Sequence, residues 1–156
     1  MTRNIRYGGI AVAFPGAVKP APDSTQLEED NMNTREIGRQ IIQELMGPKY
    51  MENRDKQRNA FNSVLHDYAD EVCFGRVWAR KGIDRKLRSI LNVAMLTALN
   101  RPAQLRSHLE GALTNGCTVD ELQEILLQAA VYCGLPAAVD AFRIAEEVLR
   151  ARKLLD

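Results

Sequence analysis

From Thr34 to the end of the chain, apolar residues recur three and four positions apart almost without interruption, and this spacing constrains the fold more than any other feature. Apolar residues at that spacing lie on one face of an α-helix and can be buried together. We expect no β-hairpin, since neither an alternating apolar–polar run nor a turn dipeptide between apolar runs stands out. The pattern predicts an all-α domain over residues 34–156, built from about six to seven helices.

Capping and breaking residues divide this stretch into helices. Thr34 is expected to cap the first helix, and Gly47-Pro48 to end it. A loop or broken helix is predicted between residues 69 and 83. A second helix is predicted from about residue 53 to residue 68, with these side chains buried: Phe61, Val64, Leu65 and Tyr68. Four further helices are predicted to begin near Asp84, Pro102, Thr118 and Pro136, the third of them with a capping box from Thr118 to Glu121.

The helix that follows Asp84 has the most regular apolar pattern in the chain. Its apolar residues obey the i, i+3, i+4, i+7 rule, and we expect them to form the centre of the core. They are Leu87, Ile90, Leu91, Ala94, Met95, Ala98 and Leu99. Small residues on several helices permit close helix approach, either within one chain or between copies.

Charge and composition exclude several classes of function. The chain carries 21 Lys and Arg against 20 Asp and Glu, so no overall basic field favours a nucleic acid or an anionic membrane surface. No uncharged apolar run approaches the roughly 18 to 20 residues that a membrane-spanning helix needs. The three cysteines form no C-x-x-C pair and, with two histidines, make no metal-binding spacing, which favours reduced thiols in a cytoplasmic protein.

Residues 1–33 differ from the rest in composition. The first 30 residues hold three of the six prolines and three of the ten glycines, which is typical of an extended or flexible arm. Arg3 and Arg6 precede a short apolar stretch, as in a secretory signal, but Pro15 and Gly16 break that stretch. We therefore expect a chain that is not exported.

No nucleophile-elbow, phosphate-loop, zinc-protease or dinucleotide motif is present, so candidate sites rest on constellations of residues. His108 follows Arg101 and Gln104 by seven and four residues, which places the three on one helical face. A histidine with cationic and amide neighbours can transfer a proton near neutral pH. The alternative is a core or surface histidine whose hydrogen bonds are satisfied, and spacing does not decide between the two.

A second candidate region surrounds Trp78. Glu71 and a basic run flank it, and guanidinium groups bind carboxylates through paired hydrogen bonds, so this region could hold an anionic small molecule. The alternative is a solvated charged face. Arg88 lies near the edge of the predicted buried stripe and is the member best placed to point into a pocket. The basic run comprises Arg76, Arg80, Lys81, Arg85, Lys86 and Arg88.

The segment from Tyr132 to Pro136 ends one predicted helix and begins another. Free backbone N–H groups at the start of the second helix favour an anion there. Cys133 is interpreted as a small buried residue rather than a nucleophile, because no histidine or second cysteine adjoins it in sequence.

These segments resemble the gamma-carboxymuconolactone decarboxylase family, in order and at the expected separation, over about residues 34–153. The matching blocks are residues 71–80, 84–91, 105–116, 118–124 and 132–138. The resemblance implies the all-helical fold that the family shares with the alkylhydroperoxidase D proteins, and assembly as a homotrimer or homohexamer. Peroxidase members carry C-x-x-C-x-x-x-H where this chain has Arg101, Gln104 and His108, and the loss of both thiols argues against peroxidase chemistry.

The resemblance also implies an activity, the decarboxylation of 4-carboxymuconolactone to the beta-ketoadipate enol-lactone in protocatechuate breakdown, without a metal or cofactor. Loss of carbon dioxide then needs cations for the carboxylates, donors for the developing oxyanion and an acid for the carbon. His108 would move the proton, Glu71 would orient or polarise the site, and Arg88 with Arg85 or Arg76 would bind the substrate carboxylate.

Trp78 and Tyr132 would wall the same pocket, with Cys133 beside them. Two other functions stay open. One is an alkylhydroperoxidase-like activity that uses Cys133 or Cys73, and the other is a non-catalytic helical oligomer that binds an acidic metabolite or a partner protein.

Overall fold

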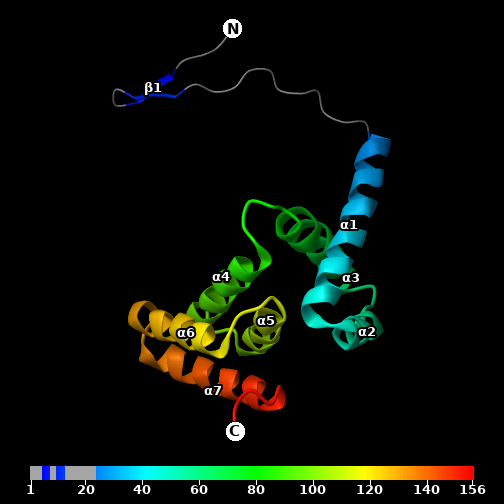
Figure 1. The fold of residues 1–156 in the computed structure, drawn as a ribbon. Coiled ribbons are helices and arrows are strands. Elements are labelled where there is room, and N and C mark those ends of the chain that lie inside the picture. Colours follow the sequence, from blue (N-terminus) through cyan, green and yellow to red (C-terminus); the bar gives the residue numbers. More distant parts are fainter. Residues whose placement is uncertain (1–4, 8–9, 13–23) are drawn as a thin grey trace. The chain divides into compact units, whose positions relative to one another are not determined.

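The computed structural model describes the backbone of residues 5–7, 10–12 and 24–156, and the surroundings of side chains from residue 33 onward. The chain falls into two compact units, residues 1–30 and residues 31–156. The second unit consists of helices joined by short connections (Figure 1), which confirms the predicted all-α domain. No helix in the described part of the chain is both long and apolar enough to cross a membrane.

A short hairpin lies within the first unit. Strands β1 (Ile5–Tyr7) and β2 (Ile10–Val12) pair antiparallel, with Ile5 opposite Val12 and Tyr7 opposite Ile10. The expectation that the chain has no hairpin is therefore wrong. Its signal was the dipeptide Gly8-Gly9 between two short runs, a common hairpin connection. The remaining residues of the predicted arm up to residue 23 lie outside the described part, and the boundary between residues 33 and 34 stays a prediction.

Helix α1 (Ser24–Met46) begins well before the predicted start. Thr34 therefore lies inside the helix and does not cap it. The predicted end is confirmed, because the chain leaves the helix at Gly47, whose φ of 86° favours glycine. Ile41 and Leu45 are buried against Trp78, whereas Ile37 is 40% exposed.

The single helix predicted over residues 53–68 is two helices, α2 (Pro48–Gln57) and α3 (Ser63–Tyr68). An asparagine turn separates them: the Asn59 side-chain oxygen accepts a hydrogen bond from the Phe61 backbone N–H (2.9 Å), and the Asn62 side-chain oxygen accepts one from the Asn59 backbone N–H (2.8 Å). Asparagine competes in this way with helical hydrogen bonding. The predicted burial of this segment's apolar residues is also wrong, since all four are exposed: Phe61, Val64, Leu65 and Tyr68.

A π-helix, η1 (Ala69–Trp78), occupies most of the segment predicted to be a loop or a broken helix. It contacts α1 at a glycine on each helix, Gly75 of η1 and Gly38 of α1. A Cβ atom at Gly38 would lie 1.8 Å from the Asp70 carbonyl oxygen, and one at Gly75 would lie 2.1 Å from the Thr34 carbonyl oxygen. The two glycines therefore allow the backbones of α1 and η1 to touch.

The four remaining helices are α4 (Arg85–Ala98), α5 (Pro102–Thr114), α6 (Val119–Cys133) and α7 (Leu135–Ala151). Helix α4 packs against α5 and α6, and α7 packs against α5 and α6. Their shared core is apolar and contains Val93, Leu105, Leu109, Ala112, Leu122, Leu126, Ile144 and Val148. The helix starts predicted at Asp84 and Thr118 are confirmed, unlike the one at Thr34: Asp84 accepts from the Leu87 N–H, and Thr118 and Glu121 form a capping box.

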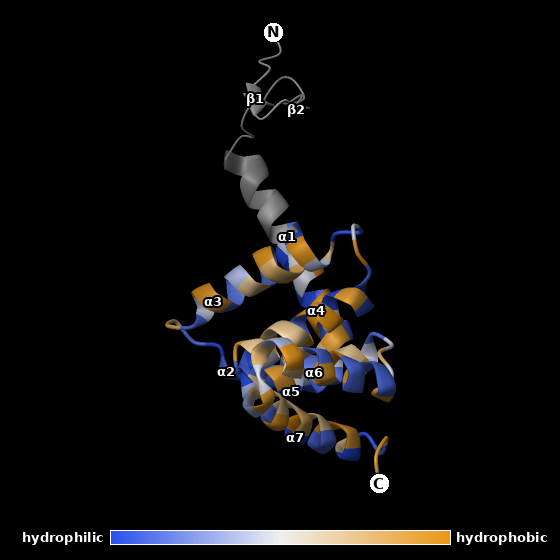
Figure 2. Cartoon of the chain, turned by 90° about the vertical axis from the view of Figure 1, so that its left-hand side faces the viewer, coloured by the Kyte–Doolittle hydropathy of each residue, from blue (hydrophilic) through white to orange (hydrophobic). Residues whose placement is uncertain are grey.

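Helix α4 does not bury the stripe that its sequence predicted. The face toward the core holds Ser89, Val93 and Thr97, and the Thr97 hydroxyl donates to the Val93 carbonyl oxygen. Of the large apolar residues in the predicted stripe, Ile90 is partly buried against the core. The other four lie outside this face and are 41% to 63% exposed: Leu87, Leu91, Met95 and Leu99. Figure 2 shows apolar ribbon segments on α3 and α4. Periodicity identified residues that share a face but not the face that meets the core of this chain.

Candidate active site

His108, on α5, lines a cavity of about 330 Å³ formed by α1, α2, η1 and α5. This volume lies within the usual range for small-molecule sites. One part of the lining is apolar, and the rest carries hydrogen-bonding groups. The apolar lining residues are Ile42, Met46, Ala69, Phe74 and Ala103, and the polar ones are Tyr50, Arg54, Gln104, Ser107 and His108.

The His108 imidazole is largely removed from water, and this burial lowers its pKa. Its Nδ1 lies 3.5 Å from the Asn92 side-chain nitrogen on α4, within reach of a long hydrogen bond. An amide N–H that donates to Nδ1 places the ring proton on Nε2. The histidine is therefore suited to be neutral near pH 7, with an Nε2–H donor.

Trp78, at the end of η1, adjoins this histidine. The two ring centres are 6.4 Å apart, and the Phe74 ring centre lies 5.6 Å from that of Trp78. Trp78 is buried with Ile41 and Leu45 of α1. The structure thus brings together the two predicted site residues Trp78 and His108, although Trp78, which was predicted to wall the pocket, does not line the cavity.

Arg88 lies on α4 one turn before Asn92, the residue that contacts His108. Its Nη2 donates to the Arg80 carbonyl oxygen (3.1 Å), two residues after Trp78. Its Nε is buried and has no hydrogen-bond partner among the described residues. Arg88 is therefore near the Trp78–His108 pair, although it does not line the cavity.

Glu71 and two of the other predicted cations, Arg76 and Arg85, form ion pairs outside the cavity. Glu71, on η1, accepts from Arg35 Nε (3.3 Å) and Arg76 Nη2 (3.1 Å). Arg85 pairs with Glu44 of α1. In one chain, none of Glu71, Arg76 and Arg85 lines the His108 cavity.

Tyr132 and Cys133 close the C-terminal end of α6. Tyr132 is 78% exposed and neither residue lines the cavity. Cys133 is exposed, so its interpretation as a small buried residue is wrong. Cys73 is half-buried and Cys117 is buried, and all three cysteines are unpaired.

Comparison with known proteins decides the family. Residues 65–147 match the profile of the carboxymuconolactone decarboxylase family. The chain is 37% identical over 113 residues to 4-carboxymuconolactone decarboxylase of Acinetobacter baylyi, covering 72% of this chain and 84% of that protein. It is 30% identical over 128 residues to nitrosuccinic acid decarboxylase of Metarhizium robertsii, covering 81% and 90% respectively. The chain belongs to the carboxymuconolactone decarboxylase family.

Two residues at the candidate site of this family member were missed in the sequence. Arg54 of α2 lines the His108 cavity, and Asn92 of α4 contacts the histidine. Arg54 stands in a charged segment where the sequence predicted no site residue, and it lies before the matched residues 65–147. Asp70, the partner of Arg54, gave no distinct signal, because Asp67 and Glu71 lie beside it in the sequence and nothing in that run indicates which carboxylate is buried.

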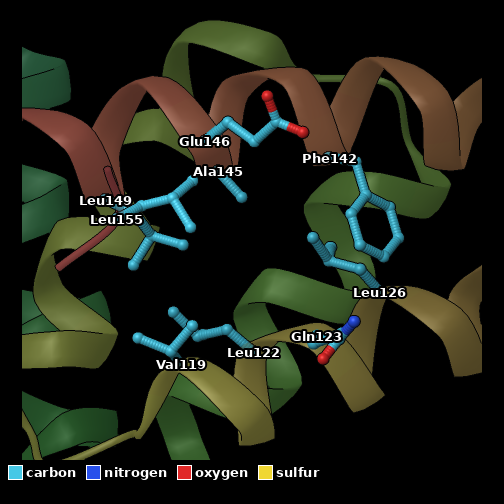
Figure 3. Close-up of a pocket in the computed structure, with 9 residues that line it drawn as sticks. All are labelled: Val119, Leu122, Gln123, Leu126, Phe142, Ala145, Glu146, Leu149 and Leu155. Atoms are coloured by element: carbon cyan, nitrogen blue, oxygen red, sulfur yellow. The ribbon is translucent and has the colours of Figure 1, made fainter.

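A second cavity of about 220 Å³ lies between α6 and α7 in this family member (Figure 3). Leu155, from the segment after α7, also lines it. Its walls are apolar except for Gln123 and Glu146. None of the predicted site residues lines this cavity, so the candidate site remains the one around His108.

Proposed function

We propose that this protein is a carboxy-lyase that decarboxylates 4-carboxymuconolactone, or a closely related unsaturated carboxylactone, without a cofactor. The observation that carries the proposal is the His108 imidazole, which lines a largely apolar cavity against Trp78 and has its Nδ1 next to the Asn92 amide. The 37% identity to a protein named for this reaction supports the choice of substrate.

The chemistry requires one carbon–carbon bond to break heterolytically. The departing carboxylate leaves as carbon dioxide, and its bonding electron pair passes through the unsaturated lactone to the carbonyl oxygen. A proton then adds to carbon to give the enol-lactone. An apolar environment favours the first step, because a carboxylate loses its hydration there while the charge of the product-like state is delocalised. Phe74, Met46 and Ile42 supply such an environment in the cavity.

The neutral form of His108 defines its role in this reaction. Its Nε2–H donates to the oxyanion that develops on the lactone, or relays a proton from water to carbon. The Asn92 amide holds the ring in that tautomer through Nδ1. Arg88, one turn before Asn92 on α4, adds a positive charge to this region, and its buried Nε has no hydrogen-bond partner among the described residues.

The proposal includes assembly of the chain with copies of itself, as a trimer or hexamer. The exposed apolar face of α4, made of Leu87, Leu91, Met95 and Leu99, is large for a surface that only meets water. A homo-oligomer that covers this face follows the usual symmetric arrangement. In such an assembly Tyr132 and Cys133 could reach the site of a neighbouring copy. We place the enzyme in cytoplasmic aromatic catabolism, where protocatechuate breakdown supplies the lactone.

The proposal is tested by ultraviolet absorbance of 4-carboxymuconolactone in the presence of the purified protein, before and after its thiols are blocked. Loss of substrate that survives thiol blocking is expected, because no cysteine lines the His108 cavity. Loss that requires free thiols would favour the hydroperoxidase alternative. Saturable binding without turnover would favour a metabolite-binding oligomer.

A further inference from the structure

Arg54 brings a guanidinium to the edge of the cavity that contains His108. Its side chain is 10% exposed, and it lines both this cavity and an adjoining one of about 610 Å³. The two cavities also share Tyr50, Ala69 and Gln104. The guanidinium therefore stands where the two cavities meet.

A buried carboxylate fixes the position of this guanidinium. Asp70, on η1, is 2% exposed and accepts from Arg54 Nη2 (2.6 Å) and Nη1 (3.2 Å). Arg54 Nη2 also donates to the His66 carbonyl oxygen (3.1 Å). An arginine has five N–H donors, so within the described part of the chain these three bonds leave two of them, one on Nη1 and the Nε–H. A guanidinium held in this way can bind an anion with little loss of side-chain entropy.

The second arginine near Asp70 faces elsewhere. Arg39 Nη1 lies 3.5 Å from the Asp70 carboxylate, and Arg39 Nη2 donates to Asp55 (2.6 Å). Arg39 lines a separate polar groove and does not line the His108 cavity. The same carboxylate thus has one arginine partner at the candidate site and one outside it.

The substrates named for the two relatives share a chemical feature. Carboxymuconolactone and nitrosuccinic acid are both dicarboxylic acids, and each keeps one carboxylate when the other leaves as carbon dioxide. The departing group gains from an apolar surrounding. The retained group keeps its charge throughout the reaction and needs a fixed cation.

We propose that Arg54, positioned by Asp70, binds the retained carboxylate of a dicarboxylic substrate and orients the departing one toward the apolar wall near His108. This inference rests on the proposed function and adds the class of substrate and the residue that selects it. Asp70 is a positioning residue in this scheme, because it acts through Arg54.

The test measures binding of a diacid that cannot react. The first compound is the saturated analogue of 4-carboxymuconolactone, which lacks the double bond that accepts electrons and so cannot react. The second is the monomethyl ester of that analogue, in which the carboxylate of the acetate substituent, the one that the reaction retains, is esterified and uncharged. Titration calorimetry with both compounds gives a ratio of affinities for each variant. We expect the wild-type protein to bind the diacid about 10 to 100 times more tightly than the ester, the range for a hydrogen bond between charged groups.

Arg54→Met should reduce this ratio to about one, and Arg54→Lys, which keeps the charge and protects the fold, should give an intermediate value. Arg39→Met is the matched control, because it removes the other arginine partner of Asp70 but no group of the cavity, and its ratio should equal that of the wild type. A ratio near one in the wild type, or one that Arg54→Met and Arg54→Lys leave unchanged, would overturn the proposal.

Turnover of 4-carboxymuconolactone separates this inference from the proposed function. If the wild type prefers the diacid through Arg54 but does not turn over the lactone, the assignment of the reaction fails and the carboxylate site stands. If the lactone is turned over with the same kcat/KM by the wild type and by both Arg54 variants, the reaction stands and the carboxylate site is wrong.

Discussion

Burial of the imidazole rings links the stability of the folded chain to pH. Burial lowers the pKa of His108, and burial followed by the charges of Arg54 and Arg58 lowers the pKa of His66. These are the two histidines of the chain. As pH falls below the unfolded-state pKa of about 6.5, the unfolded chain binds protons that the folded chain does not. The folded state is therefore stabilised above that pH and loses stability below it.

We predict that the free energy of unfolding by urea decreases between about pH 7.5 and about pH 5.5, a window above the range in which carboxylates titrate. The free energy of unfolding of His108→Gln should decrease less over the same pH range. His66→Gln should behave in the same way, since it removes the other histidine. A free energy that stays constant in the wild-type protein would contradict the lowered pKa of both histidines.

Arg88 gives a prediction for substrate affinity. Its buried Nε has no hydrogen-bond partner among the described residues, and Arg88 lies one turn before Asn92, which contacts His108. Arg88→Met should raise KM for 4-carboxymuconolactone about tenfold or more, the loss expected for a charged hydrogen bond. Arg85→Met, which removes an exposed pair with Glu44, is the control and should change KM little. Equal values of KM for Arg88→Met and the wild type would remove Arg88 from the site.

The close contact between α1 and η1 fixes the position of η1, the helix that carries both Asp70 and Trp78. Gly38→Ala places a methyl group against the Asp70 carbonyl oxygen, so the two helices must separate. We predict a loss of about 2 to 3 kcal/mol in the free energy of unfolding, the upper part of the range for overpacking. A Cβ atom at Gly82 meets nothing within 4 Å, so Gly82→Ala should be neutral or slightly stabilising. Similar losses for both variants would contradict this close contact.

At the level of elements, local signals were predicted best. The caps at Asp84 and Thr118 and the stop at Gly47 could be read from sequence, because each depends on hydrogen bonds or φ angles within a few residues. The turn between α2 and α3 was missed because the asparagines at 59 and 62 bond to each other's backbone in a segment with helical spacing. Side-chain burial on α3 could not be predicted, since it depends on which helices lie nearby.

The candidate site was predicted only in part, because some of its residues come together only in the folded chain. His108, Trp78 and Arg88 come from motif segments; the fold brings the Trp78 and His108 rings together and places Arg88 one turn before Asn92, which contacts His108. Arg54 lies on α2 and reaches the candidate site through its hydrogen bond to Asp70, whose position depends on the contact between α1 and η1. Such a contact between segments 16 residues apart leaves no periodic trace in the sequence.

For the whole molecule, the apolar face of α4 gives a prediction about assembly. Leu91 lies on this face and is 46% exposed. Leu91→Glu should convert the assembled protein to a smaller species in sedimentation equilibrium, because a buried unpaired carboxylate costs several kcal/mol. Gln43→Glu adds the same charge at an exposed polar position of α1 and should leave the mass unchanged. A wild-type protein that sediments as a monomer would contradict the proposed oligomer.

The most direct test of the account compares turnover of 4-carboxymuconolactone by the wild-type protein and by His108→Gln. Glutamine keeps a polar side chain of similar reach but cannot relay a proton. We predict that the wild type consumes the lactone with release of carbon dioxide, and that kcat falls about 100-fold or more in the variant, the usual contribution of proton transfer. No consumption by the wild type, or an equal kcat in the variant, would contradict the central claim that decarboxylation occurs at the His108 cavity.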